Sequence, residues 1–222
     1  MSGSLVKVPA DPVALEGALE LPTGAIGTVV FSHGSGSGRH SPRNRFVAET
    51  LRRGKLATLL LDLLTPDEDQ EVENRFDIDL LTERLDHAVR FVRAHAPTRA
   101  LPIGLFGAST GAASALRVAA NRPDDIGAVV SRGGRPDLTG VRLLAAVRAP
   151  TLLIVGGRDH GVIELNEAAR DALLHCDREL AIVPGATHLF EETGTLDEVA
   201  RLATRWFTRH LAVPPPRDER EE

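Results

Sequence analysis

Short runs of apolar residues recur along the chain, and the longer stretches between them repeat apolar residues with helical spacing. Uninterrupted runs rich in Val, Ile and Leu are typical of strands buried on both faces of a parallel sheet. They predict strands at residues 26–32, 55–61, 103–106, 126–130, 151–155 and 179–183. Helices are expected at residues 44–53, 78–95, 141–147, 162–175 and 195–211, with an alanine-rich helix ending at Asn121. In the second of these, apolar residues at 78, 81, 85, 89 and 92 form one stripe.

Two further strands are expected before this series, at residues 5–8 and 14–21, with no helix between them. Strands that alternate with helices predict an α/β fold, in which a mostly parallel central sheet has helices on both faces. The two leading strands predict an antiparallel edge. We expect a single domain over residues 1–213 and a disordered tail at residues 214–222, which are rich in proline and charge.

Composition narrows the possible classes of function. The 222 residues are 42% hydrophobic and 26% charged, with a net charge of −5 and no basic patch, so neither nucleic acid nor an anionic membrane is an expected partner. The one cysteine, Cys176, excludes an intrachain disulfide, and we expect it half-buried on a helix. Without disulfides or an apolar leader, a cytoplasmic location is expected. The acidic run at residues 67–73 is expected to form a solvated loop or a lid.

The sequence Gly107-Ala108-Ser109-Thr110-Gly111 fits the pattern G-x-S-x-G between an apolar strand and an alanine-rich helix. In a nucleophile elbow, a serine takes a strained conformation at such a turn and exposes its hydroxyl above the sheet. Small residues flank it because the strand and the helix pass close together. Ser109 is therefore the candidate nucleophile.

Two polar residues follow the next strands that end at the same edge of the sheet. Asp159 comes after the strand at 151–155, and His188 after the strand at 179–183. A histidine can accept the proton of a serine hydroxyl, and an aspartate can orient that histidine. Taken singly, Asp159 could instead cap the following helix and His188 could be an ordinary loop residue. The order Ser109, Asp159, His188 favours a catalytic triad.

The glycine-rich loop at residues 33–42 follows the strand at 26–32. It does not fit a dinucleotide or P-loop motif, because no third glycine and no Gly-Lys-Ser/Thr fall in place. It suits an oxyanion hole, whose donors would be the amide of Ser35 or Gly34 and that of Thr110. No metal-ligand motif such as H-E-x-x-H is present, and no cofactor or metal is expected.

Together, the motifs at residues 33–36, 107–111, 157–159 and 185–190 resemble the α/β-hydrolase superfamily, and the compact layout is most similar to its dienelactone-hydrolase-like branch. The resemblance implies the α/β-hydrolase fold. Dienelactone hydrolase itself has a cysteine nucleophile, whereas this chain has Ser109, which favours ester hydrolysis. Only about twenty residues separate the strands at 126–130 and 151–155, so no cap domain and an open site are expected.

We therefore expect a serine hydrolase that cleaves small carboxylic esters, thioesters or lactones through an acyl-enzyme. A peptidase, a perhydrolase or an acyltransferase could use the same site, and a binding or sensing module with little turnover is a further alternative. Arginines on loops at the same edge could bind a substrate carboxylate, or could merely solubilise the loops. These arginines are Arg39, Arg132, Arg135 and Arg158. The sequence does not indicate an oligomeric state.

Overall fold

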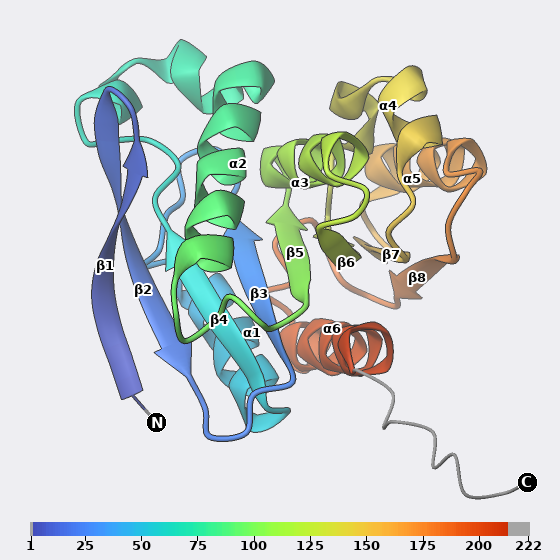
Figure 1. The fold of residues 1–222 in the computed structure, drawn as a ribbon. Coiled ribbons are helices and arrows are strands. Elements are labelled where there is room, and N and C mark those ends of the chain that lie inside the picture. Colours follow the sequence, from blue (N-terminus) through green and yellow to red (C-terminus); the bar gives the residue numbers. More distant parts are fainter. Residues whose placement is uncertain (1, 213–222) are drawn as a thin grey trace, which may run out of the picture.

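A sheet of eight strands, in the order β1-β2-β4-β3-β5-β6-β7-β8, runs through the computed structural model, which describes residues 2–212 (Figure 1). The strands are β1 (Ser2–Ala10), β2 (Val13–Leu21), β3 (Gly27–Ser32), β4 (Leu56–Leu61), β5 (Ile103–Ala108), β6 (Ile126–Arg132), β7 (Thr151–Gly156) and β8 (Arg178–Val183). β1 pairs antiparallel with β2, and β2 pairs antiparallel with β4, whereas β3 to β8 pair in parallel. The predicted α/β fold with an antiparallel edge is confirmed. The predicted disordered tail lies outside the described residues.

Helices cover both faces of the sheet (Figure 1). α1 (Pro42–Arg53) and α6 (Thr195–Leu211) pack on one face; α2 (Ile78–Ala94), α3 (Thr110–Asn121), α4 (Val141–Ala146) and α5 (His160–Ala172) pack on the other. Because successive side chains of a strand point to opposite faces, Leu105 of β5 enters the α2–α5 core and Phe106 enters the α1–α6 core. Phe106 packs on Phe31 of β3 with ring centroids 4.8 Å apart. Trp206 of α6 is buried in the α1–α6 core.

The acidic segment after β4 is more ordered than a solvated loop. It forms two short 3-10 helices, η1 (Glu68–Gln70) and η2 (Val72–Phe76). Glu68 pairs with buried Arg84 of α2 at 2.8 Å, and Arg75 binds Asp69 at 2.9 Å. The first ion pair holds the segment against α2, and the second links η2 to η1 within the segment.

Several expected boundaries shift by a few residues. α5 begins at His160 and ends at Ala172, so Cys176 lies in the turn after the helix and not on it, although it is partly buried as expected. Gly54 is the C-cap of α1, but the left-handed residue of that turn is Lys55, with φ of 60°. Between β6 and β7 lie only η3 (Pro136–Thr139) and α4, in agreement with the predicted lack of a cap domain.

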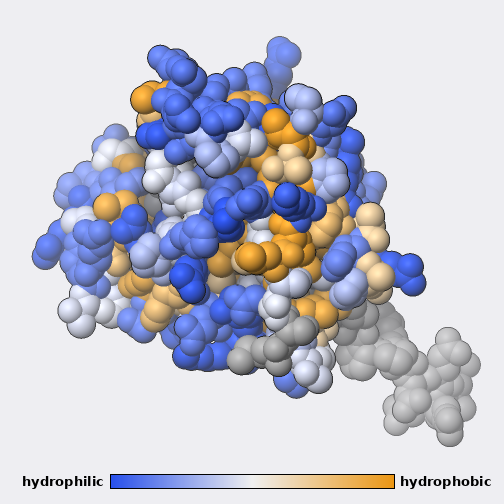
Figure 2. Space-filling view, turned by 90° about the vertical axis from the view of Figure 1, so that its left-hand side faces the viewer, coloured by the Kyte–Doolittle hydropathy of each residue, from blue (hydrophilic) through white to orange (hydrophobic). Residues whose placement is uncertain are grey.

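The surface around β1 mixes hydrophilic and hydrophobic residues (Figure 2). Leu5 of β1 is 83% exposed at this edge of the sheet. Over residues 2–212, no helix is both long and apolar enough to cross a membrane.

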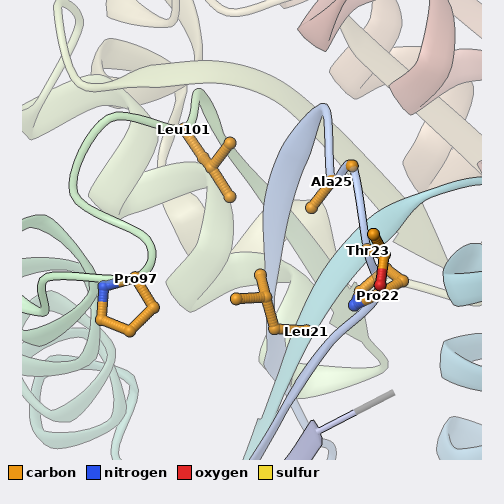
Figure 3. A pocket seen from close by; sticks show the side chains of 7 residues that line it. Leu21, Pro22, Thr23, Ala25, Pro97 and Leu101 are labelled. Atoms are coloured by element: carbon orange, nitrogen blue, oxygen red, sulfur yellow. The ribbon is translucent and has the colours of Figure 1, made fainter.

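The residues at the amino ends and at the carboxyl ends of the parallel strands differ in polarity. Next to the amino ends of β3 and β5 lies a cavity of about 500 Å³, lined by Leu21, Pro97, Leu101 and the turn at residues 22–25 (Figure 3). Its lining has no ionisable side chain and only the Thr23 hydroxyl as a polar side-chain group. The polar residues singled out from the sequence lie at the other end, after the carboxyl ends of the strands.

Candidate active site

Ser109 lies at the sharp turn between β5 and α3, with φ of 52° and ψ of −121°. A residue other than glycine is strained in this conformation, so the surroundings must hold it there. The Ser109 N–H donates to the Arg132 carbonyl at 3.2 Å, and the Arg135 N–H donates to the Ser109 carbonyl at 3.0 Å. The end of β6 and the loop after it therefore fix the backbone of Ser109 from both sides.

The glycines on either side of Ser109 are required by close approach. A Cβ at Gly111 would lie 2.2 Å from the Ser32 carbonyl oxygen, and one at Gly107 would lie 2.5 Å from the Ala112 Cα. No side chain fits at such distances from rigid backbone. The close passage of strand and helix that the G-x-S-x-G pattern predicted is therefore present.

Ser109, His188 and Asp159 form one hydrogen-bonded row although they come from three separate loops. The Ser109 Oγ lies 3.4 Å from His188 Nε2, and His188 Nδ1 lies 2.6 Å from Asp159 Oδ2. Asp159 occupies the N-cap position of α5, but its side chain makes no capping hydrogen bond. The alternative in which Asp159 caps the helix is therefore wrong. The His188 side chain is 38% exposed, so solvent and substrate can reach it.

The side chains of Phe190 and Glu192 shape the loop that carries His188, and no role for either was predicted from the sequence. Phe190 is buried among the side chains of α1 and α6, and it takes a φ of 56°. The Thr187 N–H donates to the Glu192 carboxylate at 3.1 Å, and the hydrogen bonds from Thr187 lower the pKa of Glu192. The apolar pair Leu189-Phe190 within a loop is the signal that could have indicated an anchor.

The side chain of His33 fixes the start of the loop after β3 through two hydrogen bonds. The His33 Nδ1 atom lies 2.9 Å from the Gly34 carbonyl, and the Leu63 N–H donates to His33 Nε2 at 2.9 Å. These contacts fit a neutral imidazole with its proton on Nδ1. Burial lowers the pKa of His33, which favours the same neutral form. Gly34 packs directly on Ser109, since a Cβ at Gly34 would lie 3.0 Å from the Ser109 Cβ.

The predicted oxyanion donors flank Ser109. The Thr110 N–H, at the start of α3, donates to no acceptor within residues 2–212. The Ser35 N–H donates to the Thr110 hydroxyl at 3.1 Å, so this amide already has an acceptor in the free protein. The two loops that carry the candidate donors are thus tied together through Thr110.

A cavity of about 430 Å³ opens beside Ser109 and His188. Phe76, Leu138 and Leu189 give it an apolar wall, and three arginines, Arg43, Arg132 and Arg135, give it a cationic wall. Two of these arginines were predicted from the sequence, whereas Arg43 and Phe76 were not. Arg43 lies at the start of α1, where the sequence gave no indication that its side chain reaches this cavity.

The other two predicted arginines do not line the cavity. Arg39 donates to Asp62 and to Glu16, two carboxylates that are distant in the sequence. Arg158 is exposed to solvent. A position on a loop at the correct edge of the sheet was not enough to predict the direction of these side chains.

This geometry allows proton transfer from a hydroxyl to an imidazole that a carboxylate orients. In the described part of the chain, no three His, Cys, Asp or Glu side chains converge as metal ligands would. The cavity walls can hold a small molecule that has both apolar and anionic parts.

Comparisons with known proteins agree with this architecture. The sequence model of the dienelactone hydrolase family matches residues 56–212, a range that includes Ser109, Asp159 and His188. The structure of a dienelactone hydrolase from Anabaena variabilis is 50% identical with a TM-score of 0.92, over 95% of this chain and 98% of that one. Est1E from Butyrivibrio proteoclasticus, at 17% identity and a TM-score of 0.80 over 96% and 100% of the two chains, shares the fold.

A curated relative from Mycobacterium tuberculosis has a different name. The protein called "Putative phosphoribosyl transferase" is 54% identical over 211 residues, which are 95% of this chain but 47% of that protein. The chain thus spans about half the length of this relative. The family match covers most of the chain, and the solved relative that is half identical covers nearly all of it. The chain belongs to the dienelactone hydrolase family and has the α/β-hydrolase fold.

Proposed function

We propose that this protein is a serine hydrolase that cleaves carboxylic esters, thioesters or lactones of small substrates through an acyl-enzyme on Ser109. The observation that carries the proposal is the row of Ser109, His188 and Asp159, with separations of 3.4 Å and 2.6 Å. Ester hydrolysis needs a nucleophile, a base and an orienting group within hydrogen-bond reach, and the row offers one residue for each.

In the first half of the reaction, the Ser109 Oγ attacks the carbonyl carbon while its proton passes to His188 Nε2. Asp159 holds His188 Nδ1–H and stabilises the imidazolium as it forms. The C–O bond to the leaving group then breaks, and the leaving oxygen takes the proton from His188. In the second half, His188 deprotonates a water molecule that attacks the acyl carbon, and the proton returns to Ser109 as the acid leaves.

Both halves pass through a tetrahedral intermediate with a negatively charged oxygen. The Thr110 N–H and the positive end of the α3 dipole are available to this oxygen. The Ser35 N–H lies beside it, and the oxyanion would replace the Thr110 hydroxyl as the acceptor of this second hydrogen bond.

The open cavity and its apolar wall favour small acyl groups over long lipid chains. A peptidase, a perhydrolase or an acyltransferase would use the same row of residues, and a panel of substrates separates these reactions. The phosphoribosyl transferase name belongs to a protein about twice as long, of which this chain corresponds to one half. It therefore gives no reason to prefer transfer of a phosphoribosyl group at Ser109.

The test is hydrolysis of p-nitrophenyl acetate by the wild type and by Ser109→Ala. Because the variant lacks the nucleophile, we expect kcat to fall by at least about 10⁴-fold. Ser114→Ala is the matched control, since it removes another hydroxyl from α3 whose partners are Ser32 and the Gly111 carbonyl. Equal turnover by Ser109→Ala and wild type would refute the assignment. A folded wild type that neither turns over any ester nor reacts with a fluorophosphonate would favour the binding module.

A further inference from the structure

The hydroxyl group of Thr110 lies between the two loops that carry the candidate oxyanion donors. It accepts the Ser35 N–H at 3.1 Å, and both residues line the cavity beside Ser109. A hydroxyl group has two lone pairs and one proton to donate. Within residues 2–212 the bond from Ser35 is the only hydrogen bond of this group, so its own proton has no acceptor. Thr110 is 4% exposed, and the cavity is the space into which this proton can be donated.

The direction of the Ser35 N–H is fixed without help from Thr110. The Gly34 carbonyl of the same peptide bond lies 2.9 Å from His33 Nδ1 and accepts the Ser37 N–H at 3.2 Å. In a trans peptide bond the carbonyl and the N–H point to opposite sides. These two bonds therefore aim the Ser35 N–H away from His33 and toward Thr110. The Thr110 hydroxyl is not needed as an anchor for this loop.

An oxygen that accepts the Ser35 N–H comes close to the Thr110 hydroxyl. Both oxygens then lie about 3 Å from the same nitrogen, and an N–H shared between two acceptors is a common arrangement. At such a position the hydroxyl can donate its proton to the incoming oxygen over about 2.7 Å. The Thr110 N–H, which also has no acceptor within residues 2–212, belongs to the same residue. Thr110 thus offers one donor from its backbone and one from its side chain.

We propose that the Thr110 Oγ–H is a third donor to the negatively charged oxygen of the tetrahedral intermediate, beside the N–H groups of Thr110 and Ser35. The inference rests on the proposed function, because this oxyanion forms only if Ser109 attacks a carbonyl group. In the free protein the hydroxyl is the acceptor that keeps the Ser35 N–H paired. When the oxyanion takes over this N–H, the hydroxyl donates to the same oxygen, and its proton stays on Oγ1. A bond made only in the intermediate lowers the barrier without strengthening substrate binding.

Thr110→Val tests the proposal, because valine has nearly the shape of threonine but no hydroxyl group. With p-nitrophenyl acetate we expect kcat and kcat/KM to fall by the same factor, about 10- to 100-fold. Thr110→Ser keeps the donor and should remain within about threefold of the wild type. Thr28→Val is the matched control, since the Thr28 hydroxyl is buried in β3 and has no hydrogen-bond partner in the described structure. This control should have the turnover of the wild type.

A double-mutant cycle separates a direct donor from a residue that only orients Ser35. Ser35→Pro removes the amide proton at that position. If the hydroxyl contacts the oxyanion itself, Thr110→Val should lower kcat by a similar factor in the Ser35→Pro background and in the wild type. If it acts only through the Ser35 N–H, Thr110→Val has no further effect in that background, and the proposal is wrong.

A crystal structure of Thr110→Val gives the same distinction if Ser35→Pro does not fold. We expect residues 33–37 to keep their wild-type positions while kcat is lowered, because His33 and Ser37 hold this loop from the carbonyl side. A displaced loop in the less active variant would assign the loss to positioning and overturn the proposal.

Failure of this proposal is distinct from failure of the proposed function. A wild type whose ester turnover equals that of Ser109→Ala would refute the function and the third donor together. A wild type that depends on Ser109, with an unchanged kcat in Thr110→Val, would overturn the third donor alone. A loss of turnover in Thr110→Val that Thr110→Ser shares in full would overturn it as well.

Discussion

Two buried arginines have opposite surroundings. Arg84 of α2 is 4% exposed, and it donates to Glu68 at 2.8 Å and to the Ala10 carbonyl at 2.7 Å. Arg132 of β6 is 8% exposed and donates to no acceptor within residues 2–212. The first joins β1, α2 and η1 into one unit, whereas the second faces the cavity beside Ser109.

Some buried residues, such as Arg84, stabilise the fold. Others, such as Arg132, cost stability, which the rest of the fold must supply. The buried charge of α2, Arg84, is paired, and such a buried pair is costly to break. At the carboxyl ends of the strands, Ser109 has a strained backbone and Arg132 has an unpaired charge, and both cost stability. Substitutions near α2 should therefore reduce stability without changing the reaction. Substitutions at the site should change the reaction and can increase stability.

The largest effect on stability is expected for Arg84→Met. The variant leaves Glu68 without its cation and the Ala10 carbonyl without its donor, so unfolding should become easier by about 2 to 3 kcal/mol. Chemical denaturation measures the loss. Arg90→Met on the same helix removes an exposed pair with Asp86 and should cost less than about 0.5 kcal/mol. Equal costs in the two variants would show that burial adds nothing to the stabilisation by the Arg84 pair.

Substitutions that relieve the backbone strain at Ser109 should have a smaller effect on stability. Glycine adopts φ of 52° without steric cost, so Ser109→Gly should be more stable than Ser109→Ala by about 1 kcal/mol. At Ser114, in the interior of α3, glycine should instead be less stable than alanine by about 1 kcal/mol. The same pair of substitutions thus has opposite signs at two positions of one turn and helix. The same sign at both positions would show that Ser109 is not strained.

The smallest expected effect is the change of stability with pH that His33 causes. Burial lowers the pKa of His33 below its usual 6.5, against opposing effects of the Gly34 carbonyl, Asp62 and Asp69. The unfolded chain then binds a proton that the folded chain does not, so stability falls as the pH drops through 6.5. Between pH 7 and pH 6 the loss from His33 is expected to reach at most about 0.7 kcal/mol. His33→Gln should remove this part of the pH dependence; an identical slope in wild type and variant would contradict it.

The sequence was sufficient to predict the α/β architecture and the row of Ser109, His188 and Asp159. Periodicity predicted the strands and helices because buried strands and amphipathic helices have different spacing. The row at Ser109, Asp159 and His188 could be found because parallel strands bring their carboxyl ends to one edge of the sheet. Each of the three follows the end of a predicted strand within five residues, so the position of the strand nearly fixes that of the residue.

The lining of the cavity could not be predicted in the same way. Arg39 and Arg132 were both predicted on loops at the same edge of the sheet, but Arg132 is the last residue of β6. Arg39 binds the carboxylates of Asp62 and Glu16, whereas Arg132 binds none in the described structure. These partners come from distant strands and become visible only in the folded chain. Arg43 and Phe76 reach the cavity from α1 and η2, whose positions depend on packing.

We propose Ser109 as the nucleophile and His188 as the base that activates it. Reaction with a fluorophosphonate probe, followed by peptide mass spectrometry, tests both roles. We expect one adduct per chain, located on Ser109, with no labelling of Ser109→Ala and much slower labelling of His188→Gln. An adduct on another residue, or labelling of Ser109→Ala at the wild-type rate, would contradict it.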